Sequence, residues 1–478
     1  MAPGSGSIPG FGVEPWVRGR TPGSGSIPAR GLGSSGTTLR PAGGTREVSS
    51  TYAVREARAP ARAGSGSPGE RWFGLCALVL IVASDYEFRA RDPLAAFDGS
   101  VDVAVLVEVA LYGLVGIYLS VVHGRPPRLA RAAPYRFLAT CYVGLMALSV
   151  TYAPNPTYAA VRVGQMGVLL ALCLTGARVA RRAHLHWFAH AYVALIACSV
   201  LYGIVVPSAP VSSLQRGRFT WLAIHPTVSG VLMAVATVVV VAYLAAKPRA
   251  WPGPVWPVPV YMVALVLVAG GTIASRTRGA IIGALVGALV ALFATTVGRL
   301  RAERQLAAVL VAVGVVLAAE EPILEYLRRG QNTAELLSFN ARTDLWSAAA
   351  EAFSARPLFG FGVTASRVIF YETLRLGGGH NALVNVVVDL GIVGALVWVA
   401  LVAGVVVGAV RLSTRADATL RVDRAVLVSV LAALLVDGIV FEGLGSVTNV
   451  AATWFFVCIT WLSVASRAAG GPAAARLR

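Results

Sequence analysis

The stretch GGGHNALVNVVVDLGIVGALVW, residues 377–398, leads from three glycines through a histidine and an asparagine directly into an apolar segment. It ends a mostly polar interval that opens with ARTDLW at 341–346 and passes through PLFGFG at 357–362. Apolar runs long enough to cross a bilayer recur along the chain, which has 56% hydrophobic and only 13% charged residues. The sequence therefore predicts a polytopic membrane protein.

The chain is strongly basic, with a formal net charge of +18. Almost all of its basic residues are arginines in the amino-terminal segment or in short connections between apolar runs. This distribution is typical of the cytoplasmic side of membrane proteins rather than of a nucleic-acid-binding surface. We expect membrane lipids and no nucleic acid among the partners.

Residues 1–70 are rich in Gly, Ser, Pro and Arg, and the sequence PGSGSIP occurs there twice, at 3–9 and 22–28. Such a composition cannot build a hydrophobic core, so we predict a disordered, basic cytoplasmic tail. Residues 71–478 are predicted to form a single transmembrane domain.

The expected fold is all-α, with about twelve membrane-spanning helices. We place them at 72–88, 103–122, 135–152, 158–175, 187–206, 225–245, 257–274, 279–297, 305–319, 391–410, 425–441 and 450–465. Residues 320–390 then form a large extracytoplasmic loop between the ninth and tenth spans.

Charges in the connections support this topology. With the amino terminus in the cytoplasm, every even-numbered connection faces the cytoplasm, and every one is basic, as the positive-inside rule requires. Their basic residues are Arg125, Arg128, Arg131, Arg178, Arg181, Arg182, Lys247, Arg249, Arg299, Arg301, Arg304, Arg411, Arg415, Arg421 and Arg424. We expect a multi-pass protein of the cell membrane with both termini in the cytoplasm.

Five arginines oppose this rule because they lie in connections that face outward: Arg216, Arg218, Arg276, Arg278 and Arg342. The guanidinium fork binds phosphate oxygens at two points and stays charged when it is partly desolvated. Arginines on short turns at the membrane surface therefore suit a lipid-linked phosphate or diphosphate. Alternatively, each could extend to lipid headgroups or pair with a nearby carboxylate.

Four ionisable residues fall inside or at the edge of predicted spans: Glu108, Arg162, Asp389 and Asp437. Because a charge inside a membrane is costly, such groups usually face a polar cavity and pair with one another. We predict a contact between Glu108 and Arg162.

Two of the six histidines, His225 and His380, lie on the predicted outer side. An imidazole with a pKa near neutrality can take a proton from an attacking hydroxyl, and His380 follows three glycines at a helix start. Its alternative role is a helix cap. The histidines at 184, 186 and 190 could hold a metal, but we favour an interfacial cluster beside Arg181 and Arg182.

The long loop is predicted to contain a helix at 341–355, capped by Asn340 or Thr343 and ending before Pro357. Leu345, Trp346, Ala349 and Phe353 would share its apolar face. Such a helix would form the wall or lid of a cavity.

Three segments resemble the O-antigen ligase and polymerase superfamily of bacterial membrane glycosyltransferases: SRTRGAIIGALV at 275–286, ARTDLWSAAAEAFSARPLFGFG at 341–362, and GHNALVNVVVDLGIVGALVW at 379–398. The resemblance implies an extracytoplasmic transferase whose donor is a polyprenyl-diphosphate-linked glycan. It implies that Arg278 is the turn arginine, Arg342 the arginine of the loop helix and His380 the histidine that acts on the acceptor. Arg218, with Arg216 as a competitor, is similar to an arginine ahead of the sixth span.

The sequence thus predicts transfer of a glycan to a lipid, glycan or protein acceptor, with His380 and Arg342 as catalytic residues. Arg218, Arg278, Arg216 and Arg276 would bind the substrate. Without a pair of outer carboxylates of the DxD kind, we expect no metal and no cofactor. Polymerisation of lipid-linked repeat units is the alternative within the family. A transporter of lipid-linked sugars is the alternative from another class, but the chain lacks the internal repeat that it would require.

Overall fold

The structure is a computed structural model. It describes residues 71–88, 102–123, 133–208, 217–246, 255–295, 342–374, 378–414, 419–444 and 448–470, together with positions 303, 307, 321, 325 and 326. The predicted tail at 1–70 and the predicted span at 305–319 lie outside this part of the chain, apart from position 307.

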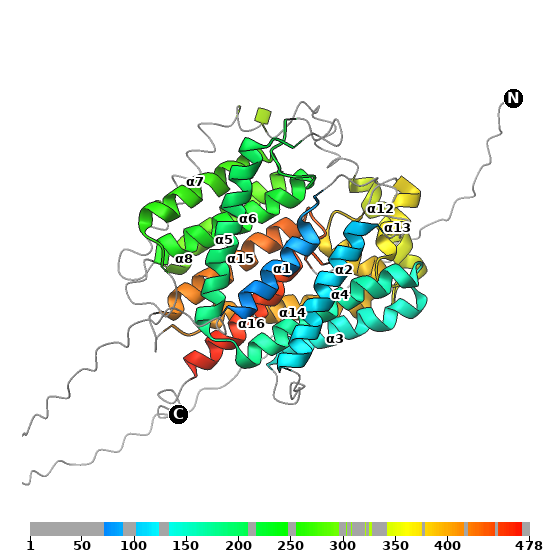
Figure 1. The fold of residues 1–478 in the computed structure, drawn as a ribbon. Coiled ribbons are helices and arrows are strands. Elements are labelled where there is room, and N and C mark those ends of the chain that lie inside the picture. Colours follow the sequence, from blue (N-terminus) through cyan, green and yellow to red (C-terminus); the bar gives the residue numbers. More distant parts are fainter. Residues whose placement is uncertain are drawn as a thin grey trace, which may run out of the picture. The chain divides into compact units, whose positions relative to one another are not determined.

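Within these ranges all regular secondary structure is helical (Figure 1). The helices are α1 (Trp72–Asp85), α2 (Val103–His123), α3 (Pro134–Ser149), followed by the short 3-10 helix η4 (Val150–Tyr152), α4 (Pro156–Val179), α5 (Arg182–Val205), α6 (Pro226–Ala246), α7 (Val258–Ala274), α8 (Arg278–Thr295), α12 (Arg342–Ala355), α13 (Ala365–Leu374), α14 (Ala382–Arg411), α15 (Leu420–Gly438) and α16 (Val450–Ala469).

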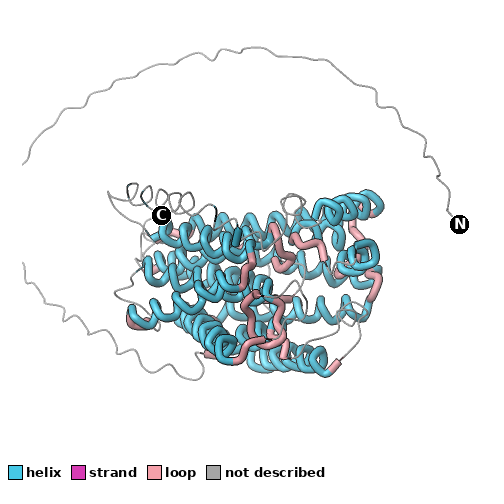
Figure 2. Tube along the Cα trace, turned by 90° about the horizontal axis from the view of Figure 1, so that it is seen from above, coloured by secondary structure: helices cyan, strands magenta, loops and turns pink. Residues whose placement is uncertain are grey.

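Seven of these helices are long and apolar enough to cross a membrane, namely α2, α4, α5, α6, α8, α14 and α16, and α1 and α7 are shorter apolar helices. Seen from above, the helices pack side by side as a bundle (Figure 2). The all-α membrane class is therefore confirmed. The number of twelve spans stays a prediction.

Prolines define several helix starts. Pro134, Pro156 and Pro226 are the first residues of α3, α4 and α6. A proline fits this position because its missing N–H has no partner in the first turn of a helix in any case. Asn155 completes the start of α4 by accepting from the Tyr158 amide over 3.1 Å.

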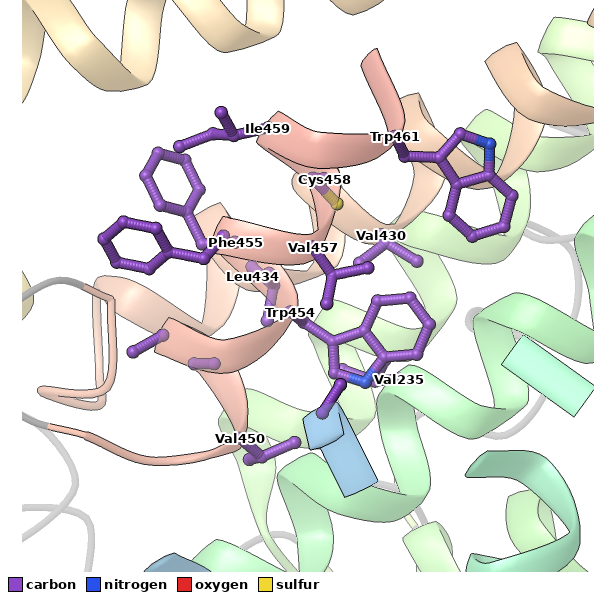
Figure 3. Packing of buried hydrophobic residues seen from close by; sticks show 14 of the residues in the cluster. Val235, Val430, Leu434, Val450, Trp454, Phe455, Val457, Cys458, Ile459 and Trp461 are labelled. Atoms are coloured by element: carbon purple, nitrogen blue, oxygen red, sulfur yellow. The ribbon is translucent and has the colours of Figure 1, made fainter. Parts of the chain in front are cut away.

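Helix α16 lies in the core of the bundle, with every residue from Val450 to Ala465 buried. Figure 3 shows its side chains, among them Trp454 and Trp461, with Val235 of α6 and Val430 of α15 beside them. A helix that is apolar all round is expected at such a position. By contrast, α2 exposes most of its apolar surface, which suits a helix at the lipid boundary.

The predicted span at 391–410 corresponds to the second part of α14, which begins at Ala382 and is broken at Gly391. Gly391 has φ +63° and ψ −164°, which interrupts the helical hydrogen bonds. The PLFGFG segment fills the break. Phe361 and Gly362 donate to the carbonyl oxygens of Val388 and Asp389 over 3.0 and 2.8 Å.

A second pair of hydrogen bonds is donated by α14 to the PLFGFG segment. Ile392 and Val393 donate their amides to Pro357 and Leu358 over 2.8 and 3.2 Å. The backbone groups released by the break are thus satisfied, as a membrane environment demands. The close approach of the PLFGFG segment to α14 requires glycine at position 391, because a Cβ there would lie 2.4 Å from the backbone of Leu358. The loop and the tenth predicted span are therefore one structural unit.

The Asp389 carboxylate caps α13, accepting from the amides of Thr364 and Ser366 over 3.1 and 2.7 Å. Its position is explained by the exposed donors at a helix start. Pairing of Asp389 with another ionisable group in a polar cavity stays a prediction.

Helix α12 confirms the predicted loop helix, and α12 and α13 lie together at one side of the bundle (Figure 1). Leu345 and Ala349 are buried and pack against Phe370 and Val388. Trp346, which was expected on the same face, is 38% exposed. The buried face is narrower than predicted because the neighbouring α13 and α14 cover only one side of α12.

Candidate active site

Ser275, Arg276 and Thr277 form the tight turn between α7 and α8. The Ser275 hydroxyl donates to the Thr272 carbonyl over 2.7 Å and accepts from the Thr277 amide over 3.2 Å. The Thr277 hydroxyl donates to the Pro226 carbonyl over 2.9 Å. These bonds fix the turn against the start of α6, so Arg278 begins α8 at a defined place.

Arg218 lies against this turn from the segment that precedes α6. Its Nε donates to the Ser275 carbonyl over 3.0 Å, and one of its terminal nitrogens donates to the Thr277 hydroxyl over 2.9 Å. Burial, together with the nearby positive charge of Arg278, holds the pKa of the Arg218 guanidinium below its usual value. Two guanidinium groups at one place repel each other, so a bound anion would stabilise both.

His225 also belongs to this region. Its Nδ1 accepts from the Thr227 amide over 3.2 Å, so it caps the start of α6. Although part of the ring is exposed, desolvation by the surrounding protein lowers its pKa to about 4. The positive charges of Arg218 and His380 add to this effect, which shows that His380 lies in the same region.

His380 is half-buried and has φ +45°, a left-handed conformation that favours glycine. Asn381, the next residue, caps α14 by accepting from the amides of Leu383 and Val384 over 2.9 and 3.1 Å. The alternative role of His380 as a helix cap is therefore wrong. A non-glycine residue held in this conformation is a feature of functional sites.

The other arginines predicted for the site are Arg276, Arg342 and Arg216. Arg276 stacks on the Tyr326 ring, with its guanidinium carbon 5.1 Å from the ring centroid, and lies close to Gly217. Arg342 is the first residue of α12, but its side chain is outside the described part of the structure, as is the whole of Arg216. The structure thus brings Arg218, Arg278 and His380 together and leaves Arg342 and Arg216 as predictions.

Asp437, one of the four charges noted within predicted spans, lies beside the same turn. A Cβ on Gly279 would be 3.1 Å from its Oδ1 atom. This oxygen is buried and has no hydrogen-bond partner among the described residues. The sequence indicated that Asp437 was unusual, but not that it adjoins the residue after Arg278.

The predicted contact between Glu108 and Arg162 is confirmed, with 2.8 Å between Arg162 Nη1 and Glu108 Oε1. Gln165 joins the pair, donating to the same carboxylate oxygen over 2.9 Å. Arg162 also donates to the Tyr158 hydroxyl over 3.3 Å. Tyr158 connects this pair to Arg367 of α13, a residue that sequence reasoning did not select.

The histidines at 184, 186 and 190, which we expected to form an interfacial cluster beside Arg181 and Arg182, are all buried. His186 and His190 are buried, and they are hydrogen-bonded to Asp423 and Tyr261 over 3.0 and 2.6 Å. Among the residues that the structure describes, no group of three or more His, Cys, Asp or Glu side chains could hold a metal ion. That the reaction needs no metal stays a prediction.

These helices and this site define a membrane protein that gathers arginines and a histidine from three separate connections. Comparison with known families adds to this: residues 263–399 match the family model described as O-antigen ligase. The match confirms the resemblance of the three motifs to the O-antigen ligase superfamily, since all three lie within it. No curated protein matches the chain.

This similarity and the apolar helices support a membrane transferase of polysaccharide biosynthesis. The matched region begins after Arg218 and His225 and ends before Asp437 and Glu442. The contributions of these four residues to the site therefore come from the geometry alone.

Proposed function

We propose that this protein transfers a glycan from a polyprenyl-diphosphate-linked donor to an acceptor hydroxyl, as an O-antigen ligase does, at the extracytoplasmic face of the membrane. The donor enters the site from the lipid. Both chain termini lie in the cytoplasm. The outward location of the site is supported by the positive-inside rule. The basic even-numbered connections mark the cytoplasmic side, and the site is on the opposite side.

The observation that carries the proposal is the position of Arg218. Its hydrogen bonds to the Ser275 carbonyl and the Thr277 hydroxyl hold the guanidinium beside Arg278 before any ligand arrives. In glycan transfer, negative charge grows on the diphosphate as the bond to the sugar breaks. Positive groups that are already oriented stabilise this charge without a cost of rearrangement.

His380 acts on the acceptor. In the proposed step the acceptor oxygen forms a bond to the anomeric carbon while the bond from that carbon to the diphosphate oxygen breaks. The acceptor proton goes to the His380 imidazole, and the bonding electrons leave with the diphosphate. A direct attack of this kind inverts the anomeric centre. Arg342, at the first position of α12, adds to the binding of the diphosphate.

The test is an assay with the purified full chain in lipid nanodiscs, supplied with a polyprenyl-diphosphate glycan and a separate acceptor. We expect Arg278→Ala and His380→Ala to lower the transfer rate by about 100-fold or more, with unchanged protein level. Arg411→Ala, at the exposed end of α14, is the matched control and should transfer at the wild-type rate. Wild-type transfer by both site variants would contradict the proposal.

The product of the same assay separates ligation from polymerisation. A ligase adds one donor glycan to the acceptor, and a polymerase produces a ladder of lengths on the lipid. A transporter would yield no product and would move the donor across the membrane.

A further inference from the structure

Glu442 lies in the connection between α15 and α16, where its side chain is 14% exposed. One carboxylate oxygen accepts from an Arg367 terminal nitrogen over 3.3 Å. The other accepts from the Asn385 side-chain nitrogen over 2.7 Å. Glu442 therefore joins α13 to the first turn of α14, directly behind the GGGHN segment.

The direction of these hydrogen bonds follows from their chemistry. An ionised carboxylate only accepts, so Asn385 must present its amide nitrogen to Glu442. The oxygen of the same amide then faces the loop, where it accepts from the backbone amide of Gly379 over 2.8 Å. The charge of Glu442 thus determines which Asn385 atom holds the residue before His380.

The backbone of the loop is pressed against both side chains. A Cβ on Gly378 would lie 1.9 Å from a Glu442 carboxylate oxygen, and one on Gly379 would lie 2.2 Å from the Asn385 oxygen. On the far side of His380, the Asn381 side chain donates to the Ile439 carbonyl over 3.0 Å. The left-handed conformation of His380 is therefore held from both of its neighbours.

Arg367, the other partner of Glu442, is itself held in place. It donates to the Tyr158 hydroxyl over 3.4 Å, and the same hydroxyl accepts from Arg162 over 3.3 Å. Arg162 is paired with Glu108. Glu108, Arg162, Tyr158, Arg367 and Glu442 thus form a chain of contacts from α2 to the loop, so the position of Glu442 is set by helices far from the site.

We propose that Glu442 is a positioning residue for the transfer reaction, acting through Asn385 to hold His380 in the orientation that accepts the proton. This inference rests on the proposed function, since it takes His380 as the group that acts on the acceptor. Glu442 does not touch the substrate. Its carboxylate orders the loop that carries the imidazole.

The donor and acceptor pattern offers a specific test by exchange. In Glu442→Gln, the new amide nitrogen faces the Asn385 nitrogen, and the two donors cannot bond. In the double variant Asn385→Asp with Glu442→Gln, the amide at 442 donates to the carboxylate at 385, which still accepts from Gly379. The exchange keeps the total charge and restores each hydrogen bond. The amide oxygen at position 442 still accepts from Arg367.

We expect Glu442→Gln to lower kcat for transfer by about 100-fold, the effect of a misplaced catalytic group, with little change in KM for the donor. The double variant should recover most of this loss. Glu372→Gln, which removes an exposed carboxylate from α13, is the control and should match the wild type. Gly378→Ala displaces the Glu442 carboxylate without changing any charge and should cause the same loss in kcat. It is the alternative variant if Glu442→Gln folds poorly.

A second measurement does not depend on transfer. The rate at which diethyl pyrocarbonate modifies His380, followed by mass spectrometry of its peptide, reports how firmly the loop is held. We expect faster modification in Glu442→Gln and the wild-type rate in the double variant. Wild-type values of kcat and modification rate in Glu442→Gln, or a double variant that recovers neither, would overturn the inference. If the wild type transfers no glycan, the proposed function fails, and the modification rates still decide whether Glu442 orders the loop.

Discussion

Two clusters of histidine and arginine in this protein differ in how their charges are satisfied. In the cluster around Asp423, one carboxylate oxygen is paired with Arg182, and the other accepts from Trp461 over 2.7 Å and lies 3.0 Å from His186. Both Asp423 and His186 are completely buried. Such a network is satisfied within the protein and holds α5, α15 and α16 together.

The cluster at the SRTRG turn is built differently. The hydrogen-bond partners of Arg218 are neutral oxygens of Ser275, Thr277 and Thr227, and a second guanidinium, that of Arg278, lies nearby. Both arginines are half-buried. The comparison teaches that residue type does not decide the role. A buried cation beside a carboxylate stabilises the fold, whereas neighbouring cations at a helix end can bind an anion.

The largest effect expected from this comparison is on stability. Asp423→Ala leaves Arg182 without its carboxylate, and we expect a loss of about 3–5 kcal/mol, the usual result of breaking one partner of a buried pair. Thermal unfolding of the detergent-solubilised protein measures it. Asp423→Asn, which keeps the shape and one acceptor, should lose less. An unchanged melting temperature in Asp423→Ala would show that the cluster does not hold the fold.

The next effect is on transfer. Arg218→Lys keeps the charge but cannot form the planar fork that reaches Ser275 and Thr277 together, so we expect a loss of about 100-fold in kcat/KM. The melting temperature should change far less than in Asp423→Ala. Arg411→Lys is the control for the same replacement at the other end of the bundle. Equal transfer by Arg218→Lys and the wild type would mean that charge alone suffices.

The smallest effect is a pH dependence. The pKa of His225 is about 4 in the folded protein against an ordinary value of 6.5, so the unfolded chain binds a proton first as the pH falls. The contribution of His225 to the free energy of unfolding is therefore fully present above pH 6.5 and is lost as the pH falls toward 4. His225→Asn keeps a cap for α6 and should reduce the change in melting temperature between pH 7 and pH 4.5. An unchanged slope would show that His225 stays uncharged for another reason.

Local signals in the sequence predicted much of the bundle. Apolar runs identified the spans, and Pro357 identified the end of the loop helix, because such signals act within a few residues. The Glu108–Arg162 pair was predictable because two costly charges at one depth require each other. The grouping of Arg218 and Arg278 followed from charges that break a rule on a single side of the membrane.

Other features depend on contacts that no local pattern carries. The apolar run after Asn381 continues through Gly391 without a change in composition, so the break in α14 becomes visible only with the PLFGFG segment in place. Glu442 lies in a separate connection more than fifty residues from the loop that it contacts, and nothing near it in the sequence indicates a role. The capping role of Asp389 was not predictable because a carboxylate that caps a helix and one that faces a cavity look alike in sequence.

The break in α14 also limits how this protein can be rearranged by recombination. A chimera that takes the PLFGFG segment from one relative and the second part of α14 from another would join two segments that did not evolve together. Since the four backbone hydrogen bonds across the break come from both sides, a mismatch of one residue would leave polar groups exposed inside the bilayer. Residues 357–393 therefore form the smallest portion of this region that can be exchanged intact.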